Sequence, residues 1–141
     1  MGLDAVVYRN KEHIELGRDE EHAKIDPGTG EVYFEDVRLS RKYYNQREAV
    51  NHRLGNISAI AELDSEVIPL IGPKSVTAQK ILYSGTHSGD KIPLEDLPKL
   101  TTELRAIRLS GQGSPLLLEF VAALEVLIQA ANHEGNPIVF V

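Results

Sequence analysis

The sequence contains no cysteine. This absence excludes disulfide bonds, thiolate catalysis and cysteine-type zinc sites. Long hydrophobic runs are also missing, and without a stretch of about 18 apolar residues we expect no segment that spans a membrane. The first residues, Met-Gly-Leu-Asp, lack the basic start and apolar core of a signal peptide. Together these absences predict a protein of the cytoplasm.

Basic residues are outnumbered: 15 Lys and Arg stand against 21 Asp and Glu, which gives a formal net charge of −6. An acidic surface repels phosphate backbones, so we expect no binding to nucleic acid. The same charge favours encounter with a basic protein through electrostatic steering. A charge of this size also keeps many proteins soluble, so charge alone leaves both interpretations open.

The composition is that of a folded chain, with 42% hydrophobic and 26% charged residues among 141. This length and content predict one globular domain over residues 1–141. No repeat or low-complexity segment divides the chain.

Five segments have the pattern of β-strands. Residues 3–8 contain the continuous apolar run 5–7, and residues 138–141 include no polar residue, which is typical of strands inside a sheet. Residues 22–25 and 31–34 flank an Asp-Pro-Gly-Thr-Gly turn and predict a hairpin. Residues 79–83 form a further β-prone run before a polar loop.

Three segments have helical periodicity. Apolar residues recur at threes and fours over residues 46–71 and again over residues 94–107. A third helix is expected to begin at Ser114 and Pro115, as N-cap and first helical residue, and to end near Gly135. The order of elements predicts an α/β (α+β) fold: a single mixed β-sheet of about five strands with about three helices packed on it.

The loop between the predicted strand 79–83 and the helix that follows is the best candidate site. Ligands and partners tend to bind beyond the carboxyl ends of strands in open α/β sheets. Gly85 and Gly89 permit backbone angles that other residues avoid. From this loop and the start of the next helix we select the following partner-binding candidates: Tyr83, Ser84, Thr86, His87, Asp90 and Glu95.

Catalysis by this loop is the alternative. Ser84, His87 and Asp90 are the residue types of a nucleophile, a base and an orienting acid. Side chains so close in one loop rarely adopt triad geometry, and neither Gly-x-Ser-x-Gly nor Gly-Lys-Ser/Thr occurs. A capped turn with an exposed His87 explains the same residues. We therefore predict no catalytic residues and no cofactor, with a small hydrolase or ligand-binding domain over residues 84–90 as the rival hypothesis.

A metal site is not predicted either. His52 and Asn56 would lie one turn apart on the predicted helix 46–71. No third ligand falls at the next matching turn, and metal sites need three or four convergent ligands.

Four pieces of the sequence together resemble the pattern of a known protein family. They are the Met-Gly-Leu start, the apolar run into a Ser/Gly/Asp-rich loop at residues 81–90, Glu-Leu-x-x-Ile at residues 103–107, and Pro-Ile-x-Phe at residues 137–140. This pattern is similar to a bacterial polymorphic-toxin immunity family, the one numbered seventy. The resemblance implies a small, non-catalytic cytoplasmic protein that neutralises a cognate toxin domain by direct binding, and it leaves the oligomeric state open.

Overall fold

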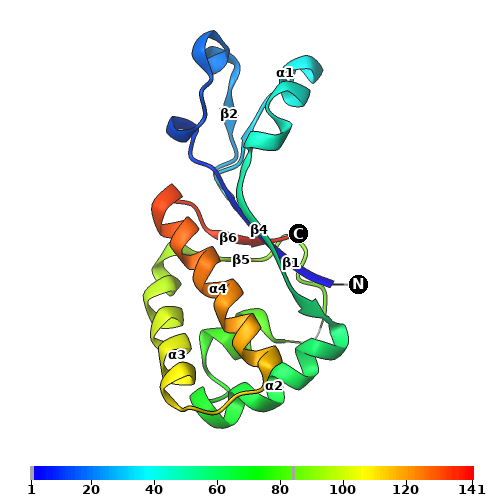
Figure 1. Cartoon of the computed structure of the whole chain (residues 1–141). Helices are drawn as coiled ribbons and strands as arrows, with labels where there is room; N and C mark the ends of the chain where they lie inside the picture. Colours follow the sequence, from blue (N-terminus) through cyan, green and yellow to red (C-terminus); the bar gives the residue numbers. More distant parts are fainter. Residues whose placement is uncertain (1, 84) are drawn as a thin grey trace.

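The computed structural model describes residues 2–83 and 85–141. Its main sheet has the strand order β4-β1-β6-β5, with every pair of neighbours antiparallel. These strands are β1 (Gly2–Tyr8), β4 (Glu48–Asn56), β5 (Lys91–Ile92) and β6 (Ile138–Phe140). β6 lies between β1 and β5 (Figure 1), and Ile138, Val139 and Phe140 are all buried.

Three long helices pack with this sheet: α2 (Ile57–Ile71), α3 (Leu97–Leu109) and α4 (Pro115–Glu134). A 3-10 turn at Leu94–Asp96 precedes α3. α4 contacts β4, β1 and β6, and it also packs against α2 and α3. The main core therefore lies between α4, its two helical neighbours and the sheet, and its largest fully buried members include Leu63, Leu100, Leu104, Leu124 and Phe140.

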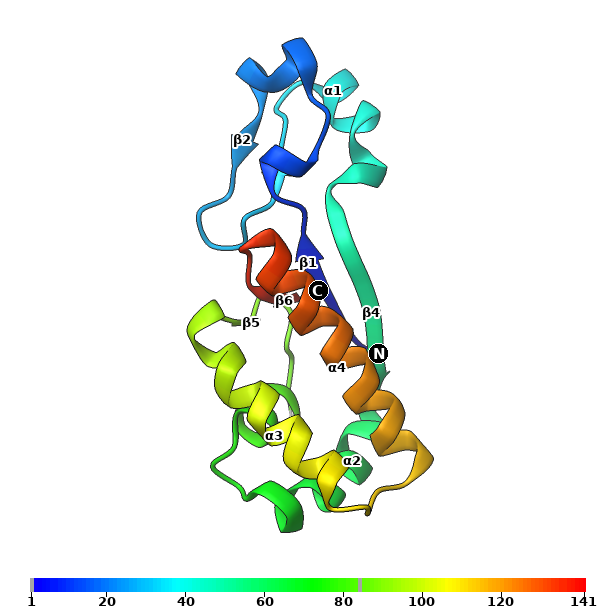
Figure 2. The same cartoon turned by 60° about the vertical axis from the view of Figure 1, so that its left-hand side comes forward.

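Residues 9–47 form a small lobe beyond one end of the sheet (Figures 1 and 2). It contains the hairpin of β2 (Lys24–Ile25) and β3 (Val32–Tyr33), the short helix α1 (Val37–Lys42), and 3-10 turns at Lys11–His13, Gly17–His22 and Tyr44–Gln46. The lobe has its own small core, composed of Ile14, Leu16, Val32, Phe34, Leu39 and Tyr43. β1 leads into the lobe and β4 leads out of it.

The α/β fold class is confirmed, with the difference that the strands of the described residues form a four-stranded and a two-stranded sheet, each antiparallel. Several elements occur where the sequence predicted them: the first and last strands, the hairpin, and the helices at Leu97–Leu109 and Pro115–Glu134. The hairpin turn is closed as its chemistry indicates, because the Asp26 carboxylate accepts a hydrogen bond of 2.7 Å from the Gly28 amide.

The predicted helix over residues 46–71 is wrong in its first half, where β4 runs from Glu48 to Asn56. The helix begins only at Ile57, because Asn56 caps it: its Oδ1 accepts a 2.8 Å hydrogen bond from the Ala59 amide. Pairing with β1 along most of β4 outweighs the helical spacing of these residues.

The predicted strand at residues 79–83 is also wrong. Residues 77–81 form a π-helical turn in which the Leu82 amide donates to the Thr77 carbonyl, a 2.9 Å hydrogen bond. This turn is held by Glu103, whose carboxylate accepts from the backbone amides of Val76 and Thr77 at 2.9 and 3.0 Å. The candidate loop therefore does not follow a strand, and it does not lie beyond the carboxyl end of a strand as binding sites in open α/β sheets do.

One helix of the described residues, α4, is long and apolar enough to cross a membrane by length and composition alone. In this structure α4 packs against the sheet, and its buried side chains belong to the main core: Leu117, Phe120, Val121, Leu124, Leu127, Ile128 and Ala131. A core helix of a folded domain has the same composition.

Candidate functional site

A groove of about 820 Å³ lies between α2 and residues 73–86, a segment that includes the π-helical turn. One wall is the exposed side of α2, with Ile57, Ile60, Ala61, Asp64 and Ile68. The other wall is formed by Pro73, Ala78, Leu82, Tyr83, Gly85 and Thr86. The lining is mainly apolar, which is typical of surfaces that bind a partner or a ligand.

The groove exists because α2 is apolar on two sides. Leu63 and Val67 are fully buried and point into the main core. Ile57 and Ile68 lie on another side and remain 61% and 38% exposed. A helix that needs only to cover a core requires one apolar stripe, so the second one is unused by the fold.

Among the described residues that line the groove, Asp64 is the only one with an acidic or basic side chain. Among residues 2–83 and 85–141 it has no salt-bridge partner. A negative charge within an apolar surface favours a partner that carries a positive group at the matching position.

The loop at one end of the groove is fixed by its own side chains. The Tyr83 hydroxyl donates to the Asp90 carboxylate, and the Tyr83 ring stacks on His87 with centroids 4.0 Å apart. His87 Nε2 lies 2.8 Å from the carbonyl oxygen of Ile81, an acceptor, so this nitrogen carries the proton. Gly85 and Gly89 have φ of +124° and +89°, as expected for a loop that requires glycine.

His87 is buried, and the expectation of an exposed imidazole is wrong. Only 7% of the residue is exposed, because the ring lies between Tyr83 and the edge-on ring of Phe140. With Nε2 bonded to a backbone carbonyl, His87 is a structural anchor of the loop. That nitrogen is not free to accept a proton from a hydroxyl group, which weakens the catalytic alternative.

The structure brings some of the selected residues together and separates others. Tyr83 and Thr86 line the groove, and His87 lines a smaller adjoining hollow of about 180 Å³ that shares Ile57 and Thr86 with it. Asp90 joins them through the hydroxyl of Tyr83 and through its own backbone amide, which donates to the His87 carbonyl at 2.9 Å. Ser84 lies outside the described residues.

Glu95 lies apart from this group. It lines a separate hollow of about 370 Å³ between the hairpin turn and the start of β5, together with Lys91 and Asn136. The selection by sequence therefore covers two different surfaces.

Sequence reasoning missed the α2 wall: Ile57, Asp64 and Ile68. The signal was present as surplus apolar residues in α2, which we assigned to a single buried stripe. Which of these residues face away from the core becomes visible only in the structure, where the helix begins at Ile57 and the exposure of each side chain is known.

Comparison of the chain with protein-family models, curated proteins and solved structures gave no match. A functional assignment therefore depends on the groove, the loop and the charge of the chain itself.

Proposed function

We propose that the protein is a non-catalytic binding protein whose partner is another protein docked in the groove between α2 and residues 73–86. The observation that carries the proposal is the unused apolar side of α2, with Ile57 61% exposed beside Asp64. An apolar anchor of the partner would fill the groove, and a basic residue beside it would face Asp64.

The resemblance to immunity family seventy is what supports a particular kind of partner. We propose a cognate bacterial toxin domain, neutralised by direct contact in the cytoplasm. The net charge of −6 supports a basic partner, because complementary charge accelerates association.

The rival is a small-molecule site. A volume of about 820 Å³ falls within the ordinary range for ligand pockets, roughly 300–1,000 Å³. Tyr83 and Thr86 would then supply the polar contacts at its end. A hydrolase is a weaker alternative, since His87 Nε2 is bonded to a backbone carbonyl.

The test uses the purified chain and the C-terminal domain encoded by the neighbouring reading frame. Ile57→Glu should weaken binding at least a hundredfold, because it places a charge within an apolar contact. Asp64→Lys should mainly slow association, and the association rate of the unchanged chain should fall with added salt. Calorimetry measures the affinity and surface plasmon resonance measures the rates.

Matched controls come from exposed residues that do not line the groove. Leu109→Glu changes an apolar residue that is 80% exposed, and Glu119→Lys reverses an exposed charge on α4. Both variants should bind as the unchanged chain does. Absence of binding to the neighbour's product, or equal losses in the control variants, would refute the docking proposal. A small molecule that binds the unchanged chain and no longer binds Ile57→Glu would establish the rival.

A further inference from the structure

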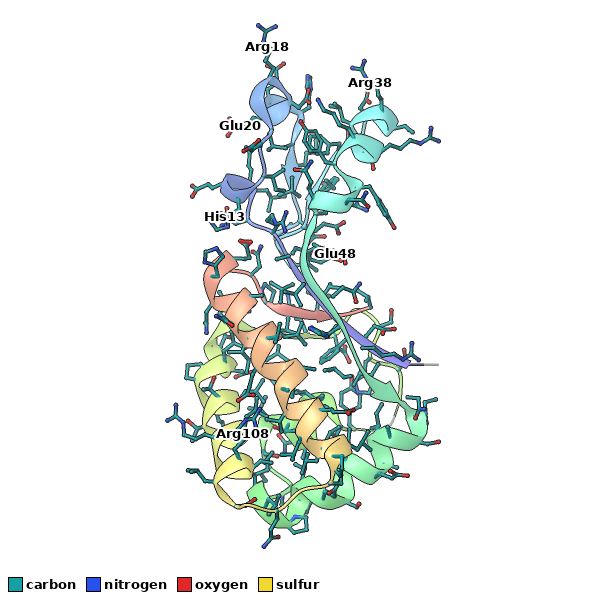
Figure 3. The ribbon with its side chains drawn as sticks, in the orientation of Figure 1. His13, Arg18, Glu20, Arg38, Glu48 and Arg108 are labelled. Carbon is teal, nitrogen blue, oxygen red and sulfur yellow. The ribbon has the colours of Figure 1, made fainter. Side chains whose placement is uncertain are left out.

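A second constellation lies where the small lobe meets the end of α4. His13 comes from the 3-10 turn Lys11–His13, and His133 and Glu134 come from the last turn of α4. Figure 3 shows His13 pointing from the lobe toward that end of the helix. Two imidazoles and a carboxylate are thus brought together from segments about 120 residues apart.

The three side chains differ in their access to solvent. The Glu134 side chain is only 5% exposed, whereas that of His13 is 38% exposed and His133 lies at the surface. Glu134 Oε2 contacts Nδ1 of His13 and lies 3.3 Å from the Asn10 amide nitrogen. The rings of His13 and His133 are stacked with centroids 4.9 Å apart.

A buried carboxylate requires compensation of its charge. Among the described residues, the only salt-bridge partner of Glu134 is His13, and neither Lys nor Arg reaches it. A divalent cation held between the imidazoles and the carboxylate would supply that compensation directly.

The spacing of the donor atoms suits a small cation. One ligand atom from each of the three residues lies within 4.8 Å of the others. Ligands of a tetrahedral zinc ion, at bond lengths of about 2.0–2.2 Å, are separated by roughly 3.3 Å. The His133 ring is exposed, so its side chain is free to reorient when an ion binds.

The surrounding backbone is fixed on each side of the junction. The Asn10 side chain donates to the Glu134 carbonyl at 3.1 Å, and the Asn136 side chain donates to the Tyr8 carbonyl at 2.8 Å. Gly135 ends α4 with φ of +69°. These hydrogen bonds hold the backbone of the lobe and the end of α4 together at the place where the three side chains meet.

We propose that His13, His133 and Glu134 form a binding site for Zn²⁺ at the junction of the small lobe and α4. Two imidazole nitrogens and one carboxylate oxygen are the donors of an open zinc site, in which a fourth position remains for water or for a group of a partner. The site is independent of the proposed docking groove, and a bound ion would link the lobe to the main body.

The experiment titrates Zn²⁺ into the full chain, freed of any histidine tag, by isothermal calorimetry. The chain should bind one equivalent, and His133→Ala and His13→Ala should each weaken binding at least tenfold. Zn²⁺ in large excess over its dissociation constant should also raise the melting temperature by several degrees, because it binds the folded state. Mg²⁺, which prefers oxygen ligands, should have no effect.

His22→Ala is the matched control, since His22 is another exposed histidine of the small lobe and is absent from the cluster. It should bind Zn²⁺ as the unchanged chain does. Glu134→Gln should abolish the rise in melting temperature; if this variant does not fold, the two histidine variants decide the question alone. Failure of the unchanged chain to bind Zn²⁺, or binding that His13→Ala and His133→Ala leave intact, would overturn the proposal.

Discussion

Glu103 illustrates how a buried carboxylate organises backbone from a different element. It lies on α3, only 7% exposed, and accepts hydrogen bonds from the amides of Val76 and Thr77 and from the Thr77 hydroxyl. These amides belong to the start of the π-helical turn, where the first N–H groups have no partner within the helix. A negative charge at this position is further favoured by the helix dipole.

Replacement of Glu103 by alanine should therefore destabilise the protein by about 3 kcal/mol. The change leaves two backbone amides and one hydroxyl buried without their acceptor, and each such group carries a penalty of about 1–3 kcal/mol before relaxation. Urea unfolding of Glu103→Ala measures the loss, and Glu119→Ala at an exposed position of α4 is the control. Equal midpoints for the two variants would contradict the capping role.

The same arrangement recurs at the start of α4. The Glu66 carboxylate accepts from the amide and the hydroxyl of Ser114, at 2.9 and 2.7 Å, while the Ser114 Oγ accepts from the Leu117 amide at 3.2 Å. Ser114 was recognisable from the sequence as an N-cap before proline. Glu66 was not, because the acid comes from another helix and no local pattern connects the two.

At the scale of elements, prediction from sequence succeeded where the local sequence alone determines the secondary structure. The first strand contains the apolar run of residues 5–7, the last strand is apolar throughout, and the helix Pro115–Glu134 has both an N-cap and a C-terminal glycine. It failed at β4 and at residues 77–81, where tertiary contacts decide. Val50, His52 and Leu54 alternate along β4, but the helical spacing of Val50, Leu54 and Ile57 is equally visible in the sequence.

Prediction of the site was partial for the same reason. The loop residues Tyr83 and Thr86 were found from their polar, glycine-flanked context and do line the groove. The facing wall on α2 was hidden, because the sequence cannot distinguish an apolar residue that faces the core from one that faces a groove. His13 and His133 were likewise too far apart in the chain for any spacing rule to connect them.

β6 offers a direct test of how far one short strand stabilises the whole sheet. Phe140 is 1% exposed and exchanges backbone hydrogen bonds with the candidate loop: its amide donates to the Asp90 carbonyl and its carbonyl accepts from the Gly89 amide. Phe140→Ala should lower the free energy of unfolding by about 3–5 kcal/mol. Val141→Ala, at a residue 51% exposed, should have little effect.

Thermal and urea unfolding of this pair of variants provide the measurement. Because His87 packs edge-on against Phe140, the Phe140 variant should also loosen the loop that closes one end of the groove. A Phe140→Ala protein that melts with the unchanged chain would show that β6 is dispensable for the core.

At the scale of the whole molecule, two cores of unequal size are connected by β1, which leads into the small lobe, and β4, which leads out of it. The main core joins the sheet and three helices, whereas the small lobe buries Ile14, Leu16, Val32, Phe34, Leu39 and Tyr43. A core of six side chains supplies little stability of its own. Local opening of the lobe should therefore precede global unfolding.

Ion pairs compensate in part for this small core, and Asp19 is central among them. Its carboxylate accepts hydrogen bonds from the Lys42 ammonium at 2.9 Å and from the Tyr43 hydroxyl at 2.7 Å. The hydrogen bond from Lys42, followed by that from Tyr43, lowers the pKa of Asp19 below its ordinary value of 3.8. The contact ties the turn at Gly17–His22 to α1 and its following turn.

The small lobe should therefore open on acidification before the main body does. A carboxylate whose pKa is lower when folded stabilises the folded state above its unfolded pKa, and this contribution is lost as the pH falls below about 4 toward the folded pKa. Two-dimensional NMR between pH 7 and pH 3 should show native amide signals of residues 9–47 weakening while those of α4 persist. Asp19→Asn, which removes the charge at every pH, should weaken the lobe already at pH 7 and reduce its further change below pH 4. Identical acid profiles for Asp19→Asn and the unchanged chain, or simultaneous loss of lobe and α4 signals, would show that the lobe does not depend on this contact.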